Sequence, residues 1–184
     1  KELLAQLDAC MQLQRNVPYS DYSSVADGNA RELLDNAIAR NKFDITEDSF
    51  GKVLSLDTNN AIAMTYYRNN TIHLFAIPSI VASCILANAE GIEKKQILAN
   101  VQLMYPLLQA ELFVDVEDLK SYIDRIIEEF KRQGLVIANG RKWMPIQDDN
   151  AKLGLLRAIS LCLLETMQRY AIVLLMLEGQ QSLA

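Results

Sequence analysis

Residues 71–89 carry no charged side chain, and this run constrains the fold more than any other feature of the chain. A run of this kind has to leave water, because exposing a long apolar surface is unfavourable. It predicts a buried or membrane-surface pair of helices, in which Pro78 kinks or restarts the first helix. The alternative is a transmembrane span. A span needs about 20 apolar residues, and His73, Ser79 and Ser83 interrupt this run.

The composition favours a helical protein. Seven glycines and four prolines among 184 residues are few for a turn-dense β fold. Intrinsic disorder is excluded because 51% of the residues are hydrophobic and 22% are charged. The net charge of −5 argues against nucleic acid as a partner, since nucleic-acid affinity depends on cations that neutralise phosphates.

The patterning divides the chain into three parts that we expect to pack as one unit. Residues 1–90 form a helical part with a buried helix at about 60–75, and 91–147 form a winged-helix-like segment. Residues 148–184 form one long C-terminal amphipathic helix. The predicted fold class is therefore mainly α, a helical domain with a small helix-helix-hairpin segment and a long last helix.

The first part also contains weaker signals. Apolar residues at three- and four-residue spacing predict a helix over 1–14. Residues 43–45 and 53–56 alternate in polarity and predict two short strands joined by a turn at 47–51. Asp57 or Thr58 is a suitable N-cap for the helix that follows.

The most regular stretch lies within 91–147. Residues 92–113 are predicted to be helical, and Asp115 is the predicted N-cap of a strongly amphipathic helix that Gly134 ends. The dipeptide Asn139-Gly140 predicts a hairpin with a type I′ turn. A helix, a second helix and a two-stranded hairpin follow one another in the order of a winged helix. The apolar positions of the amphipathic helix are Val116, Leu119, Ile123, Ile126, Ile127 and Phe130.

The charges of this second helix argue against DNA recognition. Six acids stand against four bases, which makes a poor surface for phosphates. The acids are Asp115, Glu117, Asp118, Asp124, Glu128 and Glu129, and the bases are Lys120, Arg125, Lys131 and Arg132. We therefore favour a packing or protein-interaction role over nucleic-acid binding. Adjacent carboxylates such as Glu128 and Glu129 are interpreted as solvated charges.

Cysteine and histidine usage predicts neither a metal site nor a cofactor. Cys10, Cys84 and Cys162 lie apart in apolar stretches and are interpreted as reduced core residues. His73 is the only histidine, so a zinc site or a Cys–His catalytic pair is not expected.

The candidate site lies in the middle of the helix predicted at 60–75. Six polar-tipped residues fall within eight positions: Tyr66, Tyr67, Arg68, Asn69, Asn70 and His73. Buried polar groups must be paired, so a network is expected. In one interpretation Arg68 ties helices together through a carboxylate, with Glu111 or Glu165 as its partner. In the other, Arg68 binds the phosphate or carboxylate of a ligand.

Several motifs in order resemble the bacterial membrane-bound glycerol-3-phosphate acyltransferases. They are Arg15-Asn16-Val17-Pro18-Tyr19-Ser20, Met64-Thr65-Tyr66-Tyr67-Arg68-Asn69-Asn70, His73-Leu74-Phe75-Ala76-Ile77-Pro78-Ser79, Tyr105-Pro106-Leu107-Leu108, Ala110-Glu111-Leu112-Phe113 and Gln168-Arg169-Tyr170-Ala171. The similarity covers nearly the whole chain. One departure is Gln109, at a position where the family usually has lysine.

The resemblance implies an enzyme of phospholipid synthesis, peripheral on the cytoplasmic side of the bacterial inner membrane. Such an enzyme transfers an acyl group from acyl-CoA or acyl carrier protein to the sn-1 hydroxyl of glycerol 3-phosphate. The family's catalytic His-x-x-x-x-Asp motif is absent here, because Pro78 stands five positions after His73. The chain is therefore expected to be a noncatalytic helical segment that follows the acyltransferase domain and contacts that domain and the membrane surface. The alternative is a stand-alone winged-helix-like adaptor that binds proteins.

Overall fold

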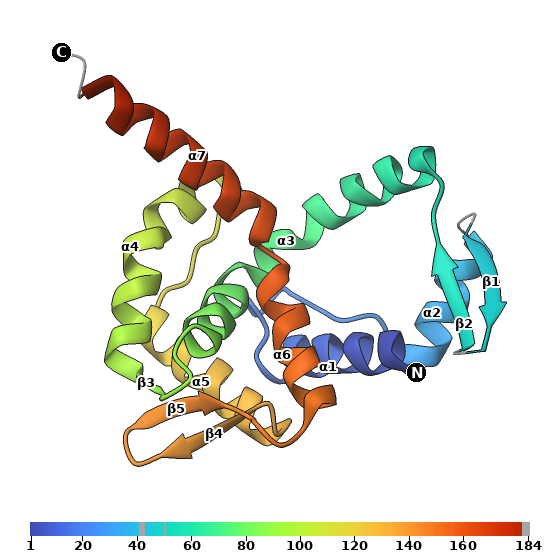
Figure 1. The fold of residues 1–184 in the computed structure, drawn as a ribbon, viewed down its shortest axis with the longest axis horizontal. Coiled ribbons are helices and arrows are strands. Elements are labelled where there is room, and N and C mark those ends of the chain that lie inside the picture. The colour runs from blue at the N-terminus through green and yellow to red at the C-terminus, as the bar shows by residue number, and fades with distance from the viewer. Residues whose placement is uncertain (41–42, 50, 182–184) are drawn as a thin grey trace. The chain divides into compact units, whose positions relative to one another are not determined.

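The computed structural model describes residues 1–40, 43–49 and 51–181, and they are mainly helical, as the composition predicts (Figure 1). The elements are α1 (Glu2–Asn16), α2 (Ala30–Arg40), β1 (Asp44–Asp48), β2 (Gly51–Ser55), α3 (Thr58–Leu86), β3 (Ile92–Glu93), α4 (Lys94–Leu112), α5 (Leu119–Arg132), β4 (Val136–Asn139), β5 (Lys142–Pro145), α6 (Asn150–Leu161) and α7 (Leu164–Gln181). The chain divides into two compact units, residues 1–74 and 75–184. Each unit is described by itself.

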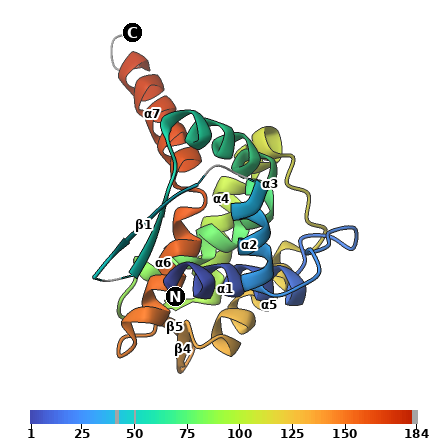
Figure 2. The same cartoon turned by 90° about the vertical axis from the view of Figure 1, so that its right-hand side faces the viewer.

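The first unit confirms the early helix and the two short strands. Helix α1 packs with α2, and β1 pairs with β2 in an antiparallel hairpin (Figure 2). Asn29 begins α2 through a reciprocal capping box. Its side chain accepts a hydrogen bond from the Glu32 backbone N–H at 3.0 Å, and the Glu32 carboxylate accepts one from the Asn29 N–H at 2.9 Å. Polar cap chemistry therefore sets where the second helix starts.

Helix α3 begins where its cap was predicted and runs on through Pro78. The Asp57 carboxylate accepts a hydrogen bond from the Asn60 backbone N–H at 2.8 Å. The prediction of a buried helix is wrong for its first half, because residues 58–71 are exposed except for the half-buried Asn60 and Met64. It is confirmed beyond that point, where Ile72, residues 76–82 and Ile85 are buried. The uncharged run is thus mostly a core helix.

Helix α5 supplies the core of the second unit. Ile123, Ile126, Ile127 and Phe130 are at most 2% exposed, so one apolar face of the predicted amphipathic helix is confirmed. Gly134 follows the helix with a positive φ of 72°, the left-handed conformation that glycine adopts at low cost.

Helix α5 starts later than predicted. Asp118 is its N-cap, and its carboxylate accepts a hydrogen bond from the Ser121 N–H at 2.9 Å. Asp115 is not the N-cap, because the backbone of the next residue is hydrogen-bonded to a side chain of α4. The Val116 N–H donates to the Tyr105 hydroxyl at 2.8 Å, and that hydroxyl donates to the Val116 carbonyl at 3.4 Å. A tertiary contact from α4 therefore delays the helix.

The hairpin after α5 belongs to a three-stranded sheet in the order β3-β5-β4. Strand β3 lies in the stretch predicted as the start of a helix, and it pairs with β5 through Ile92 and Trp143. The predicted type I′ turn is wrong. Asn139 pairs with Lys142, so the two-residue loop is Gly140-Arg141, and of these two only Gly140, with φ 60°, has a positive φ. That pattern is typical of a type II′ turn.

The last predicted helix is broken in the structure. Helices α6 and α7 meet at a bend of 50° near residues 162–163. The Ser79 hydroxyl of α3 lies at this break. It donates to the Ser160 carbonyl at 2.7 Å and accepts a hydrogen bond from the Leu163 N–H at 3.2 Å. One buried side chain thus satisfies backbone groups that the break leaves open.

One helix among the described residues, α3, is long and apolar enough to cross a membrane by length and composition. Half of its most apolar window is buried inside the protein. The bent pair α6–α7 also passes the same test when its two helices are taken together.

Candidate functional site

The predicted polar site lies on the exposed half of α3. Tyr66 and Tyr67 are 68% and 61% exposed, and Arg68, Asn69 and Asn70 are exposed as well. The Arg68 guanidinium donates to the neighbouring Asn69 side chain at 3.3 Å. The burial predicted for these five residues is therefore wrong. We name residues 66–70 the α3 polar patch.

His73 lies one turn beyond the α3 polar patch and is half-buried. Its imidazole packs edge-on against the ring of Tyr19, with ring centroids 5.4 Å apart. The next carbonyl, that of Leu74, accepts a hydrogen bond from the Gln14 side chain at 2.9 Å. His73 therefore lies where α3 contacts α1 and the loop after it within the first unit, and two of the motifs noted in the sequence meet there.

A second pair of motifs meets in the other unit, where the C-terminal end of α4 reaches α7 (Figure 1). The Arg169 guanidinium forms an ion pair with the Glu111 carboxylate at 2.6 Å and donates to the Thr166 hydroxyl at 3.1 Å. The Tyr170 hydroxyl donates to the Leu107 carbonyl at 3.3 Å. Burial, together with a hydrogen bond to Glu111, raises the pKa of the Tyr170 phenol above its usual value.

The sequence predicted a different partner for Glu111. Arg68 was expected to reach Glu111 or Glu165, which stays a prediction, and the structure shows Glu111 paired with Arg169. The Arg169 and Glu111 side chains are 63% and 35% exposed, so the ion pair contributes well under about 1 kcal/mol. Glu111 lies near the end of α4 and Arg169 lies in the first half of α7, 58 positions apart in the sequence. Only the fold shows that the two side chains meet.

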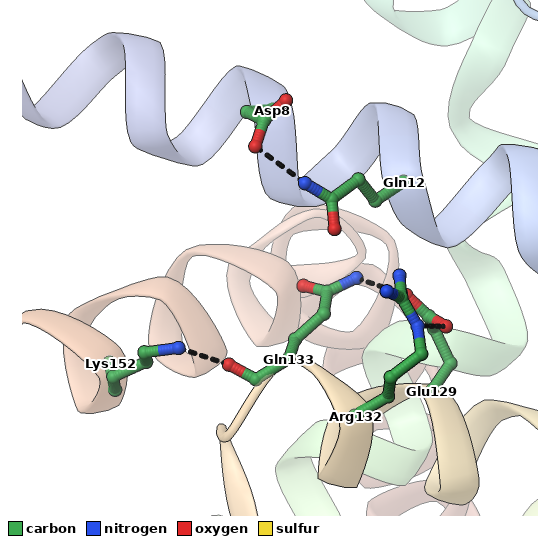
Figure 3. A network of polar contacts seen from close by, with 6 residues as sticks. All are labelled: Asp8, Gln12, Glu129, Arg132, Gln133 and Lys152. Carbon is green, nitrogen blue, oxygen red and sulfur yellow. Dashed lines mark hydrogen bonds and ion pairs between the residues drawn. The ribbon is translucent and has the colours of Figure 1, made fainter.

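A buried carboxylate was missed altogether. Glu129 of α5 is 5% exposed, although adjacent carboxylates were interpreted as solvated. Its two oxygens accept hydrogen bonds from Arg132 at 2.7 Å each and from the Gln133 side chain at 2.6 Å (Figure 3). The ion pair with Glu129 raises the pKa of Arg132 above its usual value. Lys152 donates to the Gln133 carbonyl, which neutralises the C-terminal end of α5.

Figure 3 also draws a contact of the first unit, in which the Gln12 side chain donates to the Asp8 carboxylate at 2.6 Å. Both residues lie on α1, four positions apart. Pairs at this spacing face one another on a helix and add a few tenths of a kcal/mol. We assign this contact a local, helix-stabilising role.

A shallow hollow of about 550 Å³ lies beside the first turn of α4. Its lining mixes both signs of charge, and Lys95 pairs with Glu93 at 3.1 Å. The next lysine, Lys94, pairs with Asp124 at 3.0 Å. Lys94 and Lys95 are thus neutralised and contribute little to a surface for phosphates. The hollow is lined by Ala87, Asn88, Ala89, Glu90, Gly91, Glu93, Lys95, Gln96 and Lys142.

Cysteine and metal chemistry has no support in the part of the chain that the structure describes. Cys10, Cys84 and Cys162 are reduced thiols of intermediate burial. Burial raises the pKa of the Cys84 and Cys162 thiols, which keeps them protonated and unreactive. The described residues contain no group of three or more side chains placed to hold a metal ion.

Comparison with known proteins identifies the family. The family model described as "Glycerol-3-phosphate acyltransferase C-terminal region" matches residues 1–184. Proteins named glycerol-3-phosphate acyltransferase from Shewanella putrefaciens, Shewanella oneidensis and Shewanella baltica are 42%, 44% and 39% identical over 168 residues. These residues are 91% of this chain and 20% of each relative, so the chain spans about a fifth of their length. No solved structure matches. The chain belongs to the family of glycerol-3-phosphate acyltransferase C-terminal regions.

Proposed function

We propose that this chain is the C-terminal helical segment of a glycerol-3-phosphate 1-O-acyltransferase. The full-length enzyme would transfer an acyl group from acyl-CoA or acyl carrier protein to glycerol 3-phosphate and form lysophosphatidate. The observation that carries this proposal is the family match over all 184 residues, together with relatives about five times as long as the matched stretch.

The segment itself is proposed to be noncatalytic. Its single histidine, His73, has proline at the fifth following position and lies against the ring of Tyr19. A general base of the family's kind needs a carboxylate that orients the imidazole. We infer that the segment supports an acyltransferase domain of the same polypeptide. A stand-alone adaptor explains the family match less well.

The test compares the full-length protein with the chain 1–184. We expect the full-length protein to transfer a radiolabelled acyl group from acyl-CoA to glycerol 3-phosphate, and the 184-residue chain to transfer none. The amount of labelled lysophosphatidate that is extracted measures acyl transfer by each of the two proteins. Transfer by the 184-residue chain that His73→Ala abolishes would contradict the noncatalytic role, and an inactive full-length protein would contradict the assigned reaction.

The α3 polar patch is proposed to meet the anionic substrate. The patch is exposed, and an exposed arginine beside asparagine donors suits a phosphate group. The two tyrosines and His73 would border this contact.

Substitution of Arg68 in the full-length enzyme tests the patch. We expect Arg68→Ala to leave the melting temperature unchanged and to raise KM for glycerol 3-phosphate roughly tenfold or more, with KM for the acyl donor unchanged. A lost hydrogen bond to a charged group costs about 1.5–3 kcal/mol. Asn59→Ala, an exposed change on the same helix, is the matched control. A lower melting temperature with an unchanged KM would instead assign the patch a structural role.

We also propose that residues 91–147 form a winged-helix-like segment. The order β3, α4, α5, β4, β5 supports a winged-helix-like arrangement within 91–147. The neutralised lysines of this segment favour binding to proteins over binding to nucleic acid.

We place the full-length enzyme peripherally on the cytoplasmic face of the bacterial inner membrane. The apolar helix α3 is the feature of this chain that suits a membrane-surface location. The packing of 1–90, 91–147 and 148–184 as one unit stays a prediction.

A further inference from the structure

Residues 172–177 of α7 are apolar on every side of the helix. The six side chains from 172 to 177 are each 52–66% exposed, namely Ile172, Val173, Leu174, Leu175, Met176 and Leu177. Six consecutive residues of a helix cover its whole circumference, because each turn takes 3.6 residues. Both views show this end of α7 extending beyond the rest of the second unit (Figures 1 and 2). We name residues 172–177 the α7 apolar tip.

By itself, the α7 apolar tip is too short to cross a lipid bilayer. Six residues extend the helix by about 9 Å, whereas a bilayer core is about 30 Å thick. A helix that lies in the membrane interface needs a polar face, and the tip has none. No lysine or arginine lies between 170 and 181 to attract anionic lipids. The preceding helix α6 does not lengthen the tip into a straight span, because the pair bends by 50°.

The tip fits the interior of a protein. A helix that is hydrophobic all round is typical of the core of a larger protein, and polar residues bound this one on both sides. Gln168 and Arg169 precede it, and Glu178 follows it. The N-terminal part of α7 is held on α4 by the Arg169–Glu111 ion pair and the Tyr170 hydroxyl, so the tip is presented at a defined place.

We propose that the α7 apolar tip is buried in the part of the full-length polypeptide that lies outside residues 1–184. This inference rests on the proposed function, under which the chain is one segment of a longer enzyme. The matched stretch is only 20% of the relatives' length, so most of such a polypeptide is available as the partner. Covalent linkage gives that partner a high effective concentration, which favours docking within one molecule over association between copies.

Site-specific photo-cross-linking in the full-length protein tests the docking. Leu174→p-benzoylphenylalanine places a photoreactive ketone in the middle of the tip, and the same amino acid at Ile137, an exposed apolar residue of β4, is the control. We expect irradiation of purified membranes to give an adduct at position 174 that runs as a monomer. Mass spectrometry should map this adduct to a peptide outside 1–184. The yield at position 137 should be several-fold lower.

Each other outcome overturns the docking. An adduct with lipid would assign the tip to the membrane, and an adduct at twice the monomer mass would assign it to a second copy. No adduct, or equal adducts at 174 and 137, would show that the tip has no specific partner. A second variant, Leu174→Gln with Leu175→Gln, should lower the melting temperature of the full-length protein by several degrees and remove protection of the segment against protease.

The test separates this inference from the proposed function. Acyl transfer by the wild-type full-length protein is measured in the same membranes. An active enzyme without the expected adduct refutes the docking alone. The expected adduct in a protein without acyl transfer refutes the assigned reaction alone.

Discussion

We expect Phe130→Ala to lower the free energy of unfolding of the second unit by roughly 3–5 kcal/mol, the usual range for removing a buried aromatic ring. Phe130 is 0% exposed and lies on the apolar face of α5 with Ile126 and Ile127. The void left by the ring would lack packing partners on every side. Denaturant unfolding of the 184-residue chain, followed by the fluorescence of its single tryptophan, Trp143, measures the loss in this unit.

Phe113→Ala is the matched control. Phe113 has the same ring but is 84% exposed, in the left-handed backbone conformation that ends α4. Removing an exposed side chain changes stability by no more than about 0.5 kcal/mol. Equal losses for the two variants would contradict the assignment of the core to one face of α5.

Ser79→Ala has the second largest expected effect, a loss of roughly 2–3 kcal/mol. The hydroxyl is 1% exposed and bonds both the Ser160 carbonyl and the Leu163 N–H at the break between α6 and α7. Alanine would leave both backbone groups without this partner, and an unsatisfied buried group costs about 1–3 kcal/mol. The same tryptophan signal in denaturant measures the change.

Ser83→Ala is the control for Ser79→Ala, because Ser83 lies one turn further along α3 and is exposed. We expect the free energy of unfolding of the Ser83→Ala variant to match that of the wild type. If Ser79→Ala were also neutral, the α6–α7 bend would not depend on this hydroxyl.

The elements that the sequence predicted well are those determined by local chemistry. Helix α5 follows from the spacing of Ile123, Ile126 and Phe130, since a period of 3.6 residues aligns them on one face. Asp57 marks the start of α3, because its carboxylate bonds an N–H only three residues away. Gly134 marks the end of α5, because its positive φ suits a residue without a side chain.

The errors arise where a distant residue competes with the local signal. Tyr105 holds the backbone of Val116 and moves the start of α5 from Asp115 to Asp118. Strand β3 has only two residues, too few for a periodic pattern, and it exists because β5 pairs with it. The register of β5 also moves the hairpin loop by one residue, which turns the predicted type I′ turn into the pattern of type II′.

The candidate site shows the same division. The motif residues of the α3 polar patch stand out in the sequence, but their burial was inferred from the apolar run that begins beside them. Burial depends on what packs against a helix, and α3 is exposed before Ile72 and buried after it. The pairing of Glu111 with Arg169 and the burial of Glu129 likewise need the tertiary structure.

The sequence by itself determined the helical class, the N-cap of α3 and the amphipathic face of α5, and its motifs already pointed to the acyltransferase family. These signals depend on neighbours within one or two turns, which a single chain displays directly. Only the tertiary structure decided which charges are paired, where the last helix breaks and which apolar surface stays bare. Glu111 with Arg169 and Ser79 with Leu163 lie 58 and 84 positions apart, and the meeting of such distant residues leaves no periodic trace in the sequence.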